Sequence, residues 1–167
     1  MNEQFRYKEA TLDELDRRWD INIANESGDN RWVDWKLMSI EDNKAGKCKT
    51  FVVLDGEEPI GEGTLLFLPE KVQGRTELAD GVNIANINAL RIEKSHEGKG
   101  HISKLVKLME QYAINNGYKI LTIGVEAKET RNIAIYLHWG YTTFVESEIS
   151  EIEEEGLVLY YSKVLNK

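Results

Sequence analysis

Hydrophobic residues recur at helical intervals in the first quarter of the chain. Residues 11–14 (TLDE) have the form of a capping box, in which a threonine and a glutamate satisfy each other's free backbone amides. The helix that they start is marked by Leu12, Leu15, Trp19 and Ile23. Residues 27–30 (SGDN) end it, and a second helix is predicted to follow through Trp32, Trp35 (or Val33), Leu37 and Ile40.

The other apolar segments before residue 93 have the pattern of β-strands. Residues 5–10 (FRYKEA) predict a short first strand, and residues 49–68 (KTFVVLDGEEPIGEGTLLFL) predict two strands joined by a turn at Asp55 and Gly56. Residues 83–92 (NIANINALRI) alternate from Ile84 onward and predict the next strand. Between them, residues 69–82 look like a loop.

Helical and strand patterns alternate in the second half of the chain. A long helix is predicted along Ile102, Leu105, Val106, Met109 and Ala113, with Gly117 as its C-cap. Residues 119–125 (KILTIGV) predict a strand, and residues 130–141 predict a short helix closed by Gly140. Residues 141–149 and 157–165 predict two closing strands, and the six glutamates between Glu146 and Glu155 predict a solvated hairpin end.

The predicted order of elements is βααβββαβαββ. A strand, a crossover helix and a second strand form one right-handed βαβ unit, so strands 83–92 and 119–125 are expected to be parallel. The short connections elsewhere predict antiparallel pairs. The predicted fold is α/β, with a mostly antiparallel twisted sheet around a central parallel βαβ unit. No internal repeat or linker divides the chain, so residues 1–167 are expected to form a single domain.

Composition and charge narrow the class of protein. Hydrophobic residues make up 41% of the 167 positions and charged residues 30%, which is typical of a soluble globular protein. Cys48 is the only cysteine, so an internal disulfide is excluded. The net charge of −8 disfavours nucleic acid as a partner and favours cationic molecules, although solubility explains the same excess. Because no segment has transmembrane or signal-peptide character, we expect no membrane partner and a cytoplasmic location.

Residues 96–103 (HEGKGHIS) form a glycine-rich turn between a predicted strand and a predicted helix. The first turn of a helix has unpaired amides and roughly half a positive charge, so it binds anions well. Gly98 and Gly100 allow a sharp turn and a close approach, and Lys99 and Lys104 add positive charge. The turn suits a pyrophosphate, although glycines also make turns without a ligand. The P-loop and dinucleotide-binding fingerprints both fail here.

Residues 84–145 resemble the acetyl-CoA-binding half of the GNAT family of N-acetyltransferases. The family carries Arg/Gln-x-x-Gly-x-Gly/Ala at this turn, where the chain has Glu97-Gly98-Lys99-Gly100-His101-Ile102. The family then carries a long helix, a strand, and a helix with a tyrosine shortly before a Gly-aromatic pair, which here are Tyr136 and Gly140–Tyr141. The order of elements also agrees with the family.

The resemblance implies a site for acetyl-CoA as co-substrate, with no metal. The strand backbone of Leu90, Arg91 and Ile92 would pair with the pantetheine arm. The pyrophosphate would bind the amides of Gly98, Lys99, Gly100, His101 and Ile102. Tyr136 would donate a proton to the leaving sulfur, and otherwise it is a core residue. The three histidines lack metal-ligand spacing.

Three positions depart from the family pattern. Glu97 replaces a basic or amide residue and is expected to point outward, and Ile102 replaces a small residue at the start of the helix. Glu129 stands where the family often has an asparagine, which Asn132 would replace one turn later. These departures put the affinity for CoA in question more than the fold.

The first two helices and residues 69–82 are expected to form the acceptor pocket. They carry Trp19, Trp32, Trp35, Asp29, Asp34, Glu26 and Asp80. Aromatic and acidic side chains together suit a cationic amine, and the same tryptophans also suit a hydrophobic core. No general base is evident, and the candidates are Glu62, Glu126, or a water held by Asn86 and Asn88.

The sequence therefore predicts an acetyl-CoA-dependent N-acetyltransferase acting on a primary amine of a small cationic molecule. The alternatives are a peptide or protein N-terminal acetyltransferase and a non-catalytic CoA-binding module. Residues 1–82 would form the acceptor-side half, residues 83–145 the acetyl-CoA-binding half, and residues 146–167 the closing strands. A homodimer is a further possibility.

Overall fold

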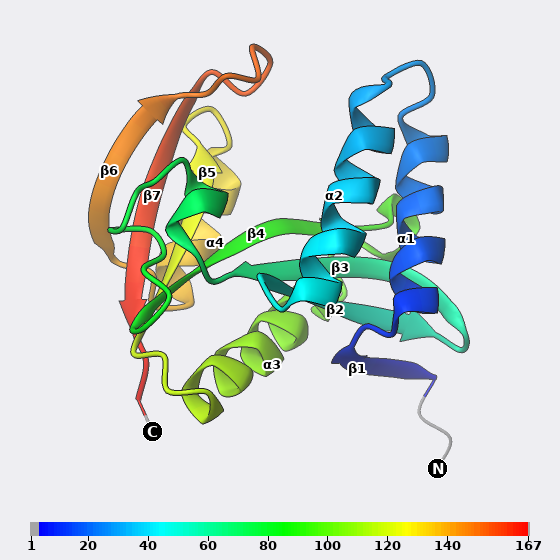
Figure 1. Ribbon diagram of the computed structural model, residues 1–167, viewed down its shortest axis with the longest axis horizontal. Coiled ribbons are helices and arrows are strands. Elements are labelled where there is room, and N and C mark those ends of the chain that lie inside the picture. The colour runs from blue at the N-terminus through cyan, green and yellow to red at the C-terminus, as the bar shows by residue number, and fades with distance from the viewer. Residues whose placement is uncertain (1–3, 167) are drawn as a thin grey trace. The chain divides into compact units, whose positions relative to one another are not determined.

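The computed structural model describes residues 4–166 and has the predicted order of elements (Figure 1). The strands are β1 (Phe5–Glu9), β2 (Cys48–Asp55), β3 (Glu58–Leu66), β4 (Ile84–Ile92), β5 (Ile120–Glu126), β6 (Thr143–Ile149) and β7 (Leu157–Val164). The helices are α1 (Leu12–Asn25), α2 (Arg31–Ala45), α3 (His101–Asn115) and α4 (Thr130–His138). Two short 3₁₀ helices, Pro69–Val72 and Lys94–His96, were not predicted.

The strands form one sheet in the order β1-β2-β3-β4-β5-β7-β6. β4 and β5 are parallel, with Ile84 opposite Ile120 and Ile87 opposite Ile123. The pairs β1–β2, β5–β7 and β6–β7 are antiparallel. The predicted fold class is therefore confirmed: a mixed α/β fold with a mostly antiparallel sheet and one parallel pair.

The chain forms two compact units. The first contains the chain up to Leu65 together with Ala89–Gln111, and the second contains Leu66–Asn88 and the chain from Tyr112 onward. The strand β4 and the helix α3 each pass from one unit into the other.

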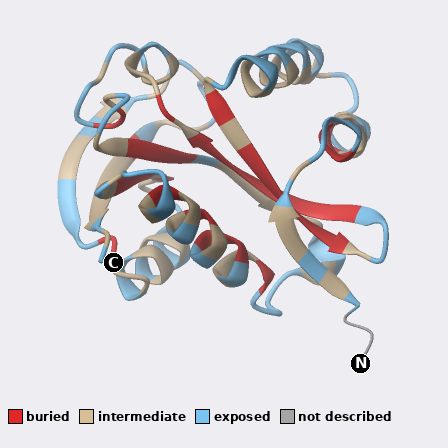
Figure 2. Ribbon diagram, turned by 60° about the horizontal axis from the view of Figure 1, so that its bottom comes forward, coloured by how far each residue is buried: buried red, intermediate tan, exposed pale blue. Residues whose placement is uncertain are grey.

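The first unit has helices on both faces of its strands. On β3, the Glu62 side chain contacts Arg18 of α1, whereas a Cβ at the next residue, Gly63, would lie 2.9 Å from Met109 Sδ of α3. Successive residues of a strand face opposite sides, so α1 and α3 cover opposite faces. Lys36 of α2 binds Asp16 and Asp20 and so joins α2 to α1. Figure 2 shows the buried residues along these strands and on one side of α3.

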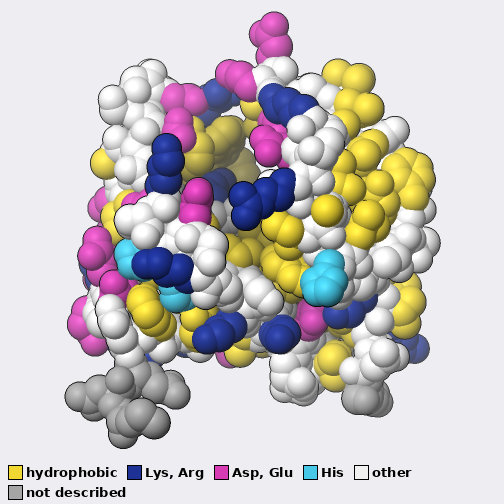
Figure 3. All heavy atoms as spheres, turned by 180° about the vertical axis from the view of Figure 1, so that it is seen from behind, with side chains coloured by type: hydrophobic (Ala, Val, Ile, Leu, Met, Phe, Trp, Pro, Cys, Tyr) yellow, Lys and Arg dark blue, Asp and Glu magenta, His cyan; other side chains and the backbone are white. Residues whose placement is uncertain are grey.

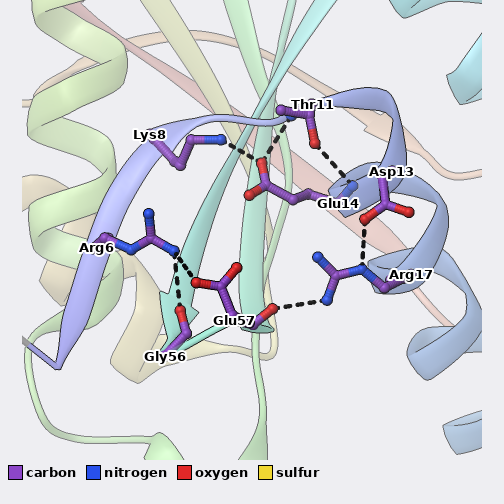
Figure 4. A network of polar contacts seen from close by, with 8 residues as sticks. All are labelled: Arg6, Lys8, Thr11, Asp13, Glu14, Arg17, Gly56 and Glu57. Atoms are coloured by element: carbon purple, nitrogen blue, oxygen red, sulfur yellow. Dashed lines mark hydrogen bonds and ion pairs between the residues drawn. The ribbon is translucent and has the colours of Figure 1, made fainter.

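The predicted capping box is present at the start of α1. The Thr11 hydroxyl accepts a hydrogen bond from the Glu14 amide, and the Glu14 carboxylate accepts one from the Thr11 amide. Figure 4 shows how Lys8 of β1 also binds Glu14, while Arg6 and Arg17 reach the β2–β3 turn at Glu57. Glu57 is largely exposed, so its ion pair with Arg6 contributes little stability.

The second unit contains a cluster of polar side chains that includes two glutamates predicted from the sequence to be solvated. Glu148 of β6 binds Arg75 and accepts a hydrogen bond of 2.6 Å from the Tyr160 hydroxyl. The Oε1 atom of Glu146 is also buried. Glu151, Glu153 and Glu154 are exposed at the hairpin end, as predicted. The prediction that this glutamate-rich segment is solvated is wrong for Glu146 and Glu148, because both belong to β6 and face Arg75.

Acidic and basic side chains are interspersed on the face drawn in Figure 3. The net charge of −8 therefore does not take the form of a surface of a single sign on that face. Among residues 4–166, no helix has the length and apolar content that crossing a membrane requires.

Candidate active site

The glycine turn leads directly into α3 in the first unit. Gly98 and Gly100 have φ angles of 75° and 83°, which side-chain-bearing residues rarely adopt. A Cβ atom built on either glycine would meet nothing within 4 Å. The backbone of the turn is therefore bent as a glycine turn requires and remains open to an incoming group.

The amino end of α3 has the charges that an anion needs. The first turn of the helix contains no acidic residue, and Lys99 and Lys104 are exposed beside it. Free amides and the helix dipole favour an anion at such an end. Glu97 is exposed, in agreement with the prediction that it points outward, and the half-buried Ile102 starts the apolar side of α3.

The His101 ring is directed toward β1. Its Nδ1 atom lies 2.8 Å from the Tyr7 hydroxyl, and the Phe5 ring lies 4.5 Å away between centroids. Burial, followed by the charges of His96, Lys104 and Lys99, lowers the pKa of His101, so the ring is neutral near pH 7. Because the ring is directed toward β1, the backbone amide is the part of His101 that stays a predicted ligand contact.

The strand segment Leu90–Ile92 follows an interruption in β4. The register with β5 ends at Ile87, and Ala89 has a φ of 56°, which is unusual for a residue other than glycine. On the β3 side, the Glu93 amide donates to the Ile60 carbonyl at 2.8 Å. The parallel ladder therefore does not extend along the backbone proposed to pair with pantetheine.

Tyr136 lies on α4 in the second unit, whereas all eight predicted cofactor-binding residues lie in the first. The ring is half-buried and lies 5.5 Å from that of Trp139. Its hydroxyl bonds none of the residues that the structure describes. Burial, followed by the charge of Glu129, raises the pKa of Tyr136, so the hydroxyl remains a donor at neutral pH.

The candidate base Glu62 is already engaged within the first unit. It is only 5% exposed, and it binds Arg18, Arg91 and the Asn22 amide. Because both of its carboxylate oxygens are already bonded to protein side chains, Glu62 is not positioned to accept a proton from a substrate. The geometry argues against this candidate.

Other predicted acceptor-side residues also have partners in the protein. Asp29 binds Arg31, and Asp80 accepts hydrogen bonds from the amides of residues 82–84. In the second unit Asn86 donates to Thr122, while Asn88 is exposed and Glu126 lies 3.3 Å from Lys128. Of the three tryptophans, Trp19 is buried, as expected of a core residue.

The roles of Arg18 and of the Arg91 side chain were not predicted from the sequence. Arg18 shares the inner face of α1 with Leu15 and Asn22, and all three are buried. An arginine at a core position of a helix predicts a buried anionic partner, so this spacing contained a usable signal.

No group of three or more His, Cys, Asp or Glu side chains is arranged to hold a metal within residues 4–166.

Solved structures share this fold over nearly the whole chain. An N-acetyltransferase from Staphylococcus aureus Mu50 has a TM-score of 0.72 at 16% identity, covering 98% of this chain and 100% of that one. An aminoglycoside 6′-acetyltransferase type Ii has a TM-score of 0.70 at 15% identity, covering 97% and 98%. The ribosomal-protein α-N-acetyltransferase RimL, in complex with coenzyme A, has a TM-score of 0.71 at 13% identity, covering 98% and 96%.

Comparison with curated proteins gives no match. The family model of the acetyltransferase (GNAT) family, in contrast, matches residues 9–141, which is most of the chain. This match includes the glycine turn, α3 and Tyr136. The chain therefore belongs to the acetyltransferase (GNAT) family, and the class of acetyl-CoA-dependent N-acetyltransferase that the resemblance implied is confirmed.

Proposed function

We propose that this protein transfers the acetyl group of acetyl-CoA to the primary amine of a small molecule. The observation that carries the proposal is the amino end of α3, where two glycines with positive φ stand in open space before a helix without acidic residues in its first turn. The pyrophosphate of acetyl-CoA would bind the amides of residues 98–102. The pantetheine arm would lie along Leu90–Ile92.

The acceptor must lose a proton before it can attack the thioester. An alkylamine with a pKa of about 10.4 is mostly charged at pH 7, and its neutralisation costs roughly 4.6 kcal/mol. The neutral nitrogen then attacks the acetyl carbonyl, the carbon–sulfur bond breaks, and an amide and a free thiol are formed. One proton goes to the sulfur, and a charged acceptor releases one more to solvent.

Tyr136 is proposed as the hydrogen-bond donor to the departing sulfur. Its hydroxyl has no partner among the described residues, and its raised pKa keeps it protonated at neutral pH. Donation becomes important only as negative charge develops on sulfur, so the hydroxyl would act on the transition state rather than on binding. A water is the proposed acceptor of the amine proton, since Glu62 is held by two arginines.

Thiol release from acetyl-CoA, measured with a panel of small amines and short peptides, tests the proposed function. We expect release with small amines and an acetylated product detectable by mass spectrometry. Preference for peptides would instead favour the N-terminal acetyltransferase alternative. Binding of CoA without any release would favour the non-catalytic module.

The cofactor site is tested by Gly100→Asp, which places a side chain and a negative charge where the pyrophosphate is proposed to dock. Gly56→Asp is the matched control, because Gly56 has a φ of 61° and equally open surroundings in the β2–β3 turn. Calorimetry should show that Gly100→Asp loses affinity for CoA while Gly56→Asp keeps it. Equal affinities in the two variants would mean that the cofactor binds elsewhere.

A cytoplasmic location and a homodimer stay predictions.

A further inference from the structure

The Arg91 guanidinium lies over two indole rings in the first unit. Its central carbon is 4.7 Å from the centroid of Trp32 and 5.4 Å from that of Trp19. The Nη1 atom donates to Glu62 at 2.8 Å. A planar guanidinium that lies against two aromatic rings and is anchored at one nitrogen is restricted in orientation.

The other nitrogens of Arg91 remain available to a ligand. Nε and Nη2 bond none of the residues that the structure describes, and neither is among its fully buried unpaired atoms. The Arg91 side chain is 27% exposed, whereas that of Arg18, which binds the same glutamate, is 2% exposed. Glu62 therefore already has a buried arginine partner, and Arg91 is the more accessible of the two cations.

This arrangement changes the expectation for the acceptor. The indole faces of Trp19 and Trp32 were expected to bind a cationic substrate, but the protein's own guanidinium occupies that position. A second cation placed there would be repelled by Arg91. A preoriented guanidinium with free N–H groups matches instead a carboxylate, which can accept two parallel hydrogen bonds.

We propose that Arg91 selects an acceptor that carries a carboxylate, as an α-amino acid does beside its amine. The inference rests on the proposed acetyl transfer and names the substrate class for it. Arg91 would bind and position the acceptor through Nε and Nη2, while Glu62 and the two indoles hold the guanidinium in place. The Arg91 backbone keeps its separate proposed role beside the pantetheine arm.

The test compares α-amino acids with their own carboxamides, which keep the size and remove the charge. The ratio of kcat/KM for acid over amide is measured in wild type and in Arg91→Met. Differences in amine pKa within each pair cancel in this comparison. Because a hydrogen bond to a charged group is lost, the ratio should fall at least about tenfold.

Two further variants separate charge from geometry. Arg91→Lys keeps a point charge but loses the planar fork, so its ratio should fall between those of wild type and Arg91→Met. It also serves if Arg91→Met fails to fold. Lys36→Met removes a positive charge from the same helix pair without touching the indoles, and it should retain the wild-type ratio.

Binding of N-acetylamino acids, the expected products, gives a readout that does not need turnover. The fluorescence of the indoles next to Arg91 should respond to the carboxylate and not to the carboxamide, and the response should disappear in Arg91→Met. If amines are acetylated but the acid-to-amide ratio is the same in wild type and Arg91→Met, the inference is overturned and the proposed function stands. If no amine is acetylated but the carboxylate binds through Arg91, the proposed function fails and the Arg91 site stands. Absence of both overturns both.

Discussion

Arg91 of the first unit and Arg75 of the second are surrounded by similar groups but differ in the burial of their unpaired nitrogens. Each binds a glutamate of a neighbouring strand, Glu62 or Glu148, and each has an aromatic ring under its guanidinium. One unpaired nitrogen of Arg75, Nη1, is fully buried, whereas neither Nε nor Nη2 of Arg91 is, although the two side chains are similarly exposed, at 23% and 27%. The two arginines therefore differ in the burial of their unpaired nitrogens rather than in their overall exposure.

The difference shows how the cation proposed to bind a ligand can be distinguished from a structural one. Within the part of the chain that the structure describes, Glu148 has Arg75 as its cationic partner and the Tyr160 hydroxyl as its other donor. Glu62 has Arg18 and Asn22 besides Arg91. Removal of Arg75 would leave a carboxylate without a counter-charge, while removal of Arg91 would not. The two arginines therefore differ in how many other partners their glutamate has and in whether their own unpaired nitrogens are buried.

The largest expected effect is on the stability of Arg75→Met. Loss of the guanidinium leaves Glu148 largely buried without its counter-charge, which should lower the free energy of unfolding by roughly 3 kcal/mol. Arg91→Met should cost only about 1 kcal/mol, since Glu62 keeps its other donors. Urea denaturation of both variants checks the comparison. A greater loss in Arg91→Met would mean that Arg91 is the structural arginine.

A smaller effect is expected at alkaline pH. Burial, followed by the hydrogen bond to Glu148, raises the pKa of Tyr160 above its ordinary value of 10.0. The protonated phenol thus contributes stability that is complete below the unfolded pKa of about 10 and is lost as the pH rises toward the folded pKa. Unfolding free energies of Tyr160→Phe should fall less steeply than those of wild type between about pH 9 and 10.5. Parallel profiles would show that Tyr160 contributes nothing to this dependence.

Much of the fold could be predicted because local signals agreed with it. The capping box at Thr11 and the alternation of residues 83–92 marked their elements, and the crossover helix made β4 and β5 parallel. The glycine turn was predictable for the same reason, since Gly98 and Gly100 adopt the positive φ that glycines favour. The family resemblance rested on the same local features and is confirmed.

Side chains that meet across long stretches of sequence could not be predicted in this way. Arg18, Glu62 and Arg91 lie on three separate elements, and no spacing within one segment links them. Glu148 looked like part of a solvated acidic run because its partner, Arg75, lies on a distant loop. Asp29, Trp19 and Trp32 were expected to bind a cationic substrate, and the sequence does not show that arginines of the protein already contact them.

The kcat of Tyr136→Phe is the most direct test of the proposed enzyme. The variant keeps the ring and its packing and removes only the proposed donor, so kcat should fall by roughly 10²- to 10⁴-fold while acetyl-CoA affinity is retained. Tyr118→Phe is the matched control, because Tyr118 is also a half-buried tyrosine of the second unit, stacked on Phe67, and its kcat should match that of wild type. A kcat for Tyr136→Phe equal to that of wild type would contradict the account and leave Tyr136 as a core residue.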